Sequence, residues 1–155
     1  MFRTLVFFFI YYFCVFDLSK SNGDLTRQNP LIKKVLLKGE KGEGYYFEPS
    51  ELKFKTGKLY NLQITNVSDY KHYFTSIKFS KSIFTRKVQL SIKEKKVAEI
   101  KGVISEVEIF PSHTLEWWFV PIKTGIFNDL TCEIIDKISK RKHSEIGMNG
   151  TIIIE

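Results

Sequence analysis

The sequence predicts an all-β protein, folded as a Greek-key β-sandwich of seven or eight strands. Short runs rich in Val, Ile, Phe, Tyr and Thr alternate with turn signals, which is typical of strands and not of long amphipathic helices. Tyr60, Leu62 and Ile64 alternate with polar residues at the period of two that a half-buried strand requires. With 155 residues, 43% of them hydrophobic and 15% aromatic, the chain can bury the core of one domain.

The other strands are predicted from the same signals. Strands are expected at 45–47, 52–55, 60–65, 72–79, 103–110, 115–120, 126–132 and 151–154. Between the fourth and fifth of these, 82–87 is compatible with a helical turn and 93–96 with an exposed tip. In the fifth strand, Val103, Val107 and Ile109 are expected to face the same side.

The first 21 residues differ from the rest and predict a secretory signal peptide. Arg3 precedes an uncharged apolar run at 5–16, and the polar residues 19–22 follow it. This run is shorter than the ~20 residues of a membrane-spanning helix, so a cleaved leader is favoured over its alternative, a membrane anchor. The predicted organisation is a signal peptide at 1–21, a flexible lead-in at 22–31 and one β-sandwich domain at 32–155. We therefore expect a periplasmic or otherwise exported protein that meets a membrane only through an uncleaved leader.

The charge of the chain gives a weaker indication. The whole chain carries a formal net charge of +7, and loss of Arg3, Lys20 and Asp17 with the leader leaves +6. Because the lysines are spread along the chain, an ordinary solvated surface is the simpler interpretation, and attraction of an acidic partner is the alternative. A dense basic stripe and a nucleic-acid-binding signature are both missing from the sequence, so no nucleic-acid partner is predicted.

Once the leader with Cys14 is removed, few side chains remain that could bind a soft metal. Cysteine then occurs once, at Cys132, methionine once, at Met148, and histidine three times. Cys132, His143 and Met148 lie within seventeen residues just before the final strand, whereas His72 opens a strand far upstream. A sandwich can bring such distant segments together at one end.

One thiolate, two imidazoles and a weak axial thioether form the ligand set of a blue-copper site. Taken singly, a lone cysteine, methionine or strand histidine is more often an ordinary core or surface residue. A lone thiol in an oxidising compartment has no partner for an internal disulfide, which favours a functional role. The residues by themselves therefore leave both a copper site and an ordinary core open.

Over residues 45–155 the chain resembles the small exported cupredoxins of the plastocyanin and azurin type. The matching strings are FEPSELKFKTGKLYNLQITN, YKHYF with the following FSKSIFTRKVQ, EIFPSHTLEWWFVPIKTGIF, and a Cys followed by HSEIGMNGTIIIE. Gly147, Met148 and Gly150 in the last string form the most family-like feature. The resemblance implies a β-sandwich electron carrier with one copper ion, and it assigns the ligands His72, Cys132, His143 and Met148.

Three departures from the family pattern carry their own expectations. Ten residues separate Cys132 from His143, so the segment 133–142 must bulge out if both residues bind one metal. Tyr73 stands where family members often carry Asn or Ser, which predicts a less rigid site. The segment 125–132 is one residue longer than in plastocyanin, which predicts a bulge in that strand.

The inserted segment also suggests a partner. Its basic residues Lys137, Lys140, Arg141 and Lys142 are expected beside His143. In the family this ligand has its outer edge nearest to solvent, so the basic residues could recruit an acidic redox partner, with a solvated charge run as the alternative. His113 is expected to be a solvated turn residue and not a ligand.

The leading hypothesis is a monomeric, mobile electron carrier that works between redox protein partners. The alternatives are a copper-binding or delivery protein without redox cycling, and a metal-free cupredoxin-like interaction module. An enzyme is not predicted, because three histidines are too few for the further copper centres of an oxidase or nitrite reductase. Cys–His nucleophilic catalysis has no supporting motif.

Overall fold

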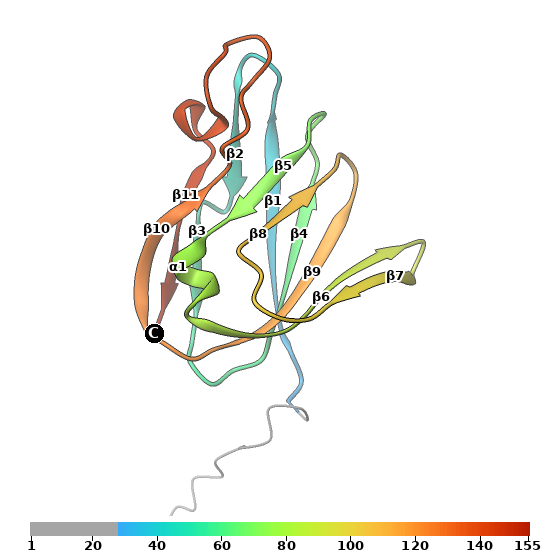
Figure 1. Ribbon diagram of the computed structural model, residues 1–155, viewed down its shortest axis with the longest axis vertical. Coiled ribbons are helices and arrows are strands. Elements are labelled where there is room, and N and C mark those ends of the chain that lie inside the picture. The colour runs from blue at the N-terminus through green and yellow to red at the C-terminus, as the bar shows by residue number, and fades with distance from the viewer. Residues whose placement is uncertain (1–27) are drawn as a thin grey trace, which may run out of the picture.

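The structure, a computed structural model, describes residues 28–155, which form a sandwich of two facing β-sheets (Figure 1). The six-stranded sheet has the order β2 (Gly44–Glu48), β1 (Leu31–Glu40), β4 (Tyr60–Asn66), β9 (Thr114–Pro121), β6 (Ile83–Ile92) and β7 (Lys95–Ile100). The five-stranded sheet has the order β3 (Glu51–Phe54), β11 (Asn149–Ile154), β10 (Gly125–Thr131), β5 (His72–Thr75) and β8 (Glu106–Ile109). Two short helices, α1 (Ile77–Ser80) and η1 (His143–Ile146), lie between strands. The all-β sandwich is confirmed, with eleven strands in this part of the chain and not seven or eight.

Alternating side chains of the two sheets fill the space between them. In β4, Leu62 and Ile64 are fully buried, as the period of two predicts. Trp117 of β9 packs edge-on against Phe79, and its indole N–H donates to Oγ1 of Thr85 at 3.0 Å. Such close-packed interiors deform little, so the core holds the strand ends in fixed relative positions.

The pairing within the five-stranded sheet gathers three chain segments at one end of the sandwich. β10 runs antiparallel to both β11 and β5, with Thr131 opposite Asn149 on one side and Thr75 on the other. The residues that follow β10 therefore lie beside the start of β5 and the start of β11. The register of β10 with β11 shifts between Phe127 and Leu130, which confirms the bulge predicted for this strand.

The strand predicted at 72–79 is too long. β5 ends at Thr75, and helix α1 follows. The start of this helix is held by a carboxylate from β10, because Asp129 accepts hydrogen bonds from the Ser76 hydroxyl at 2.7 Å and from the Lys78 N–H at 2.8 Å. These contacts end the strand early, and they come from a residue about fifty positions away in the sequence.

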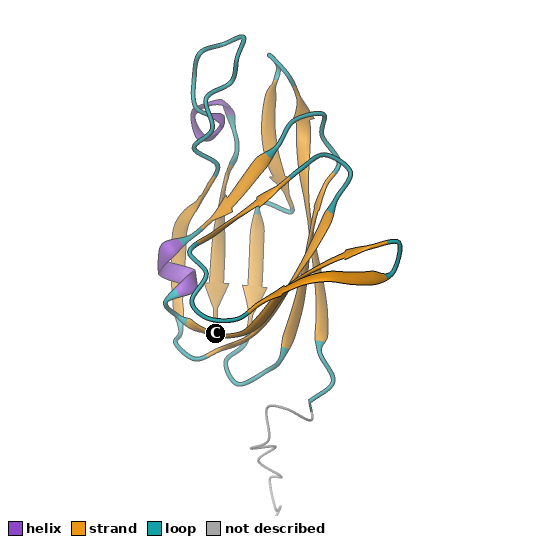
Figure 2. Cartoon of the chain, turned by 45° about the vertical axis from the view of Figure 1, so that its right-hand side comes forward, coloured by secondary structure: helices purple, strands orange, loops and turns teal. Residues whose placement is uncertain are grey.

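Two further local predictions are wrong and one is confirmed. The helical turn expected at 82–87 is not formed, because 83–87 belong to strand β6. Val103 was expected on the same side as Val107 and Ile109, which are buried, but it is 82% exposed because strand β8 begins only at Glu106. The exposed tip expected at 93–96 is confirmed by the turn between β6 and β7, a hairpin that projects from the sandwich (Figure 2).

The predicted signal peptide at 1–21 and most of the predicted lead-in at 22–31 lie outside the described residues. Just before β1, the side chain of Gln28 donates to the Gly57 carbonyl at 3.2 Å and accepts from the Leu59 N–H at 2.9 Å. Within residues 28–155, no helix is long and apolar enough to cross a membrane.

Candidate metal centre

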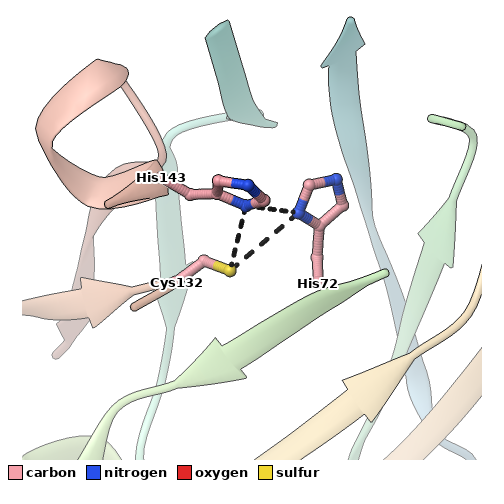
Figure 3. A group of neighbouring side chains, drawn as sticks. All are labelled: His72, Cys132 and His143. Carbon is pink, nitrogen blue, oxygen red and sulfur yellow. Dashed lines mark hydrogen bonds between the residues drawn. The ribbon is translucent and has the colours of Figure 1, made fainter. Parts of the chain in front are cut away.

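Three of the four predicted ligands converge at the end of the sandwich where β10, β5 and β11 meet (Figure 3). His72 opens β5, Cys132 directly follows β10, and His143 is the first residue of η1. The Sγ atom of Cys132 lies 3.6 Å from Nδ1 of His143 and 3.9 Å from Nδ1 of His72. The two Nδ1 atoms are 3.1 Å apart, and all three side chains are fully buried.

These three donor atoms have the spacing that one metal ion needs. In a triangle with sides of 3.1, 3.6 and 3.9 Å, the point equidistant from the corners lies about 2.1 Å from each. Metal–nitrogen bonds of about 2.0–2.1 Å and metal–sulfur bonds of about 2.3 Å are usual for zinc, another divalent ion of this size. A thiolate and two imidazoles in this trigonal arrangement suit copper.

Ser68 orients the ring of His72. Its Oγ lies 2.7 Å from Nε2 of His72, and it also lies 2.8 Å from Oδ1 of Asn66 and 2.9 Å from the carbonyl oxygen of Tyr70. Because the single hydroxyl proton has two oxygen acceptors, we infer that Ser68 accepts a hydrogen bond from the Nε2–H of His72. That tautomer leaves the lone pair of Nδ1 free to bind a metal.

Asn66 ties this loop to the sheet. Its amide nitrogen donates to the carbonyl oxygens of Tyr70 at 2.7 Å and Ile109 at 2.8 Å, and its Oδ1 accepts the N–H of Ser68 at 3.0 Å. The loop that carries Ser68 is therefore held by Asn66 at the end of β4.

The Cys132 side chain is buried, and a backbone N–H of β5, the strand that begins at His72, contacts its sulfur atom. The N–H of Tyr73 points at Sγ from 3.3 Å. Burial raises the pKa of the Cys132 thiol, while the backbone amides of Ile134 and Tyr73 act in the opposite direction. A metal ion must therefore displace the thiol proton at neutral pH, as metal binding to cysteine generally does.

The long segment between Cys132 and His143 forms a closed loop that projects from the sandwich, as expected (Figure 1, orange-red loop at the top). Ile135 pairs with Lys142 in an isolated antiparallel bridge. The N–H of His143 donates to the carbonyl oxygen of Ile134 at 2.8 Å. The chain therefore returns to the position it left, so that the insertion does not separate the two ligands.

A buried carboxylate holds the inside of this loop. Asp136 accepts hydrogen bonds from the backbone N–H groups of Ser139 at 2.6 Å and Ile138 at 3.0 Å. The backbone hydrogen bond from Ser139 is the main reason why the pKa of Asp136 lies below its usual value. The loop thus carries its own internal order.

Met148 lies beside Cys132 and His143 through its backbone. Its N–H donates to the carbonyl oxygen of His143 at 2.8 Å, and its own carbonyl oxygen accepts the N–H of Cys132 at 3.2 Å. The Met148 side chain is fully buried in the same core cluster as Cys132. The complete ligand set of a type 1 copper centre, with two His, one Cys and one Met, is therefore present.

Both ligand histidines are neutral at pH 7. Burial, with a smaller effect of the neighbouring His143, lowers the pKa of His72 to about 3. Burial also lowers the pKa of His143, against the opposing effect of Asp136. Neither ring has to lose a cationic proton before it binds a metal.

Aromatic rings enclose the two histidines. The Tyr45 ring centroid lies 4.6 Å from that of His72 and 4.3 Å from that of His143, and Tyr70 lies 5.8 Å from His143. Tyr45 Oη and His143 Nε2 are buried and have no hydrogen-bond partner within residues 28–155. Sequence reasoning missed Tyr45, Tyr70 and Ser68. Tyr70 and Ser68 are close to His72 in the sequence, which could have indicated them, whereas no sequence signal indicated Tyr45.

The expectation that His143 has its outer edge near solvent is wrong, because this residue is 0% exposed. Two of the four basic residues expected beside it are engaged by carboxylates. Lys142 lies 2.8 Å from Glu133, and Arg141 lies 3.9 Å from Glu145. His113 is exposed in a turn, as expected.

Comparison with known proteins supports the fold. No protein-family model matches the sequence, and no curated protein matches it. A multicopper oxidase from Campylobacter jejuni shares 16% identity and a TM-score of 0.56, over 82% of this chain and 30% of its own. A Cu-containing nitrite reductase from Thermus scotoductus shares 11% identity and a TM-score of 0.57, over 82% and 31%. A copper nitrite reductase from Nitrosomonas europaea shares 11% identity and a TM-score of 0.56, over 87% and 52%.

The chain thus spans 30% to 52% of the length of these solved structures, and identities this low establish the fold alone. The ligand set rests on the chain's own geometry. The protein has the cupredoxin fold and carries, at one end of its sandwich, the His-Cys-His-Met ligand set of a type 1 copper centre.

Proposed function

We propose that this protein binds one copper ion and carries single electrons between redox protein partners. The observation that carries the proposal is the convergence of one sulfur and two Nδ1 atoms, all buried, at distances of 3.1 to 3.9 Å from one another. In this proposal His72, Cys132, His143 and Met148 would hold the metal, with one thiolate, two imidazoles and one thioether as donors. Copper held by such donors supplies one-electron exchange between Cu(I) and Cu(II).

The residues of the chain contribute by holding the donors still and excluding water. Ser68 and Asn66 fix the ring of His72, and the loop base fixes His143. Because the donor atoms already lie near bonding positions, little rearrangement accompanies a change in oxidation state. Small rearrangement favours fast electron exchange, which supports an electron-transfer role for the site.

We further propose that the protein is exported and meets an acidic partner. The apolar segment at 5–16 supports export, and the net positive charge supports an acidic partner. Fractionation of the native cells and N-terminal sequencing of the isolated protein test the first point. Export with cleavage gives a mature chain that begins near residue 22, whereas the full-length chain in the cytosol would contradict it.

The decisive experiment is the visible spectrum of the protein after addition of Cu(II), compared between wild type and Cys132→Ser. We expect an intense thiolate-to-copper band in the wild type and none in the variant. Met148→Leu should keep the band and shift the reduction potential, because it changes only the axial donor. Copper binding without the band would favour a delivery protein, and no binding would favour a metal-free interaction module.

A further inference from the structure

The buried edge of His143 leaves the metal site without a ligand ring at the surface. An electron that enters or leaves the site must therefore cross other side chains. Among residues 28–155, the aromatic rings in contact with His143 or His72 from outside the ligand set are those of Tyr45 and Tyr70. Tyr45 is 1% exposed, whereas Tyr70, whose ring contacts that of His143, is partly exposed.

The position of Tyr70 is determined by the same hydrogen bonds that hold His72. Its carbonyl oxygen accepts from the amide of Asn66 at 2.7 Å and lies 2.9 Å from Oγ of Ser68. Its ring meets that of His143 edge to face, at an interplanar angle of 69°. Tyr70 therefore forms a continuous contact between a ligand ring and the surface.

A cation from the inserted loop lies on this surface ring. The Nζ of Lys137 is 5.7 Å from the centroid of Tyr70, within the range of a cation–π contact. Arg141 and Lys142 are engaged by carboxylates, and Lys140 makes no cation–π contact with Tyr70 in the described part of the chain. Two acidic residues lie near this surface. Asp136 accepts hydrogen bonds from backbone N–H groups inside the loop, and Asp69 is exposed and directly precedes Tyr70 in the chain.

We propose that Tyr70 is the point at which electrons enter and leave this protein, and that Lys137 brings an anionic redox partner to its ring. This inference rests on the proposed electron-carrier function. In the outward step, Cu(I) loses one electron and becomes Cu(II), the acceptor gains that electron, and Tyr70 is neither oxidised nor deprotonated. In this proposal the imidazole edge of His143 is covered, and electrons reach it through Tyr70.

The first test locates the docking surface without electron transfer. Hexacyanochromate(III), a paramagnetic and redox-inert trianion, is added to the isotopically labelled protein, either loaded with Cu(I) or free of metal. We expect broadening of the amide signals around Tyr70 and Lys137 that weakens with added salt. Broadening centred elsewhere, or none, would overturn the docking site. This result can be read even if the protein binds no copper, so it separates the inference from the proposed function.

The second test follows oxidation of the Cu(I) protein by hexacyanoferrate(III) in a stopped-flow instrument. Tyr70→Leu should slow the reaction about tenfold, the scale of losing a central aromatic contact. Tyr70→Phe keeps the ring and should keep the rate. The matched control is Tyr73→Leu, a partly exposed tyrosine next to a ligand whose ring lies on the other face of β5. A Tyr70→Leu rate that is unchanged or faster, with an unchanged visible band and potential, would show that the ring only covers the site.

The charge is tested with two lysines of the same loop. Lys137→Gln should lower the rate about threefold at low ionic strength, with the difference vanishing at high salt. Lys140→Gln removes the same charge without the contact to Tyr70, so it should have a smaller effect. Equal effects of the two substitutions would overturn the specific role of Lys137.

Discussion

The hydroxyl oxygen of Ser68 lies 2.7 Å from Nε2 of His72 in the buried interior, and this contact turns Nδ1 of the same ring toward Cys132. Ser68→Ala therefore leaves the Nε2–H of His72 without an acceptor. We expect a loss of about 1–3 kcal/mol in the free energy of unfolding. Copper binding should weaken by about 10–100-fold, as for other partners of metal-bound histidines.

Urea denaturation of the metal-free protein and competition with a copper chelator measure these two quantities. Ser91→Ala is the matched control, because Ser91 lies at the end of β6 and accepts only a hydrogen bond from Gln89 at 3.2 Å. Similar losses in both variants would contradict a specific role for Ser68.

Removal of the Tyr45 hydroxyl, unlike removal of the Ser68 hydroxyl, should not lower the free energy of unfolding. This oxygen is buried without a partner in the described residues, whereas the ring packs on both histidines. Tyr45→Phe removes an unsatisfied polar atom and keeps the ring, so the free energy of unfolding should stay equal or rise by up to about 1–3 kcal/mol. Thermal unfolding of the two proteins side by side checks this, and a clear fall in stability would reveal a partner for the hydroxyl.

The inserted loop can be shortened without loss of the ligand set. Ile135 and Lys142 already face each other in an antiparallel bridge. Replacing 136–141 by Asn-Gly should close that bridge as a two-residue hairpin. Because the His143 N–H is held by the Ile134 carbonyl at the base of the loop, the copper band should remain. Loss of copper binding in a variant that still folds would mean that the outer loop itself positions His143.

The metal-free protein should lose stability as the pH falls. The folded-state pKa of His72 is about 3 against an ordinary value of 6.5, so the unfolded chain binds more protons between these values. Protonation of His72 therefore leaves the free energy of unfolding unchanged well above pH 6.5. That free energy falls as the pH decreases from 6.5 toward 3. Between pH 7 and pH 5 the loss from His72 is about 2 kcal/mol, and His143 adds to it in the same direction.

Urea denaturation at pH 7, 6 and 5 measures this dependence. Few carboxylates titrate in that interval, so the histidines dominate the slope. His72→Gln should flatten the slope, while His113→Gln, which changes an exposed turn residue, should leave it as in the wild type. Equal stability of the wild type at pH 7 and pH 5 would show that His72 is not held neutral.

Local patterns along the chain predicted much of the fold and most of the site. The alternation around Leu62 predicted β4, and the grouping of Cys132, His143 and Met148 indicated candidate ligands, which the resemblance to cupredoxins then assigned together with His72. The same patterns failed where a distant contact decides the outcome. The strand at 72–79 was predicted too long because Asp129, far along the chain, holds the start of helix α1.

The amino-acid sequence by itself determined which donor atoms are available and the faces of the strands on which apolar residues lie, because both depend on residue type and on a period of two. The tertiary structure alone decided that the donors meet in a buried triangle, because the pairing of β10 with β5 and β11 joins segments far apart in the chain. It also decided that Tyr45 and Tyr70 cover His143, since ring packing depends on three-dimensional proximity, which no spacing in the sequence specifies.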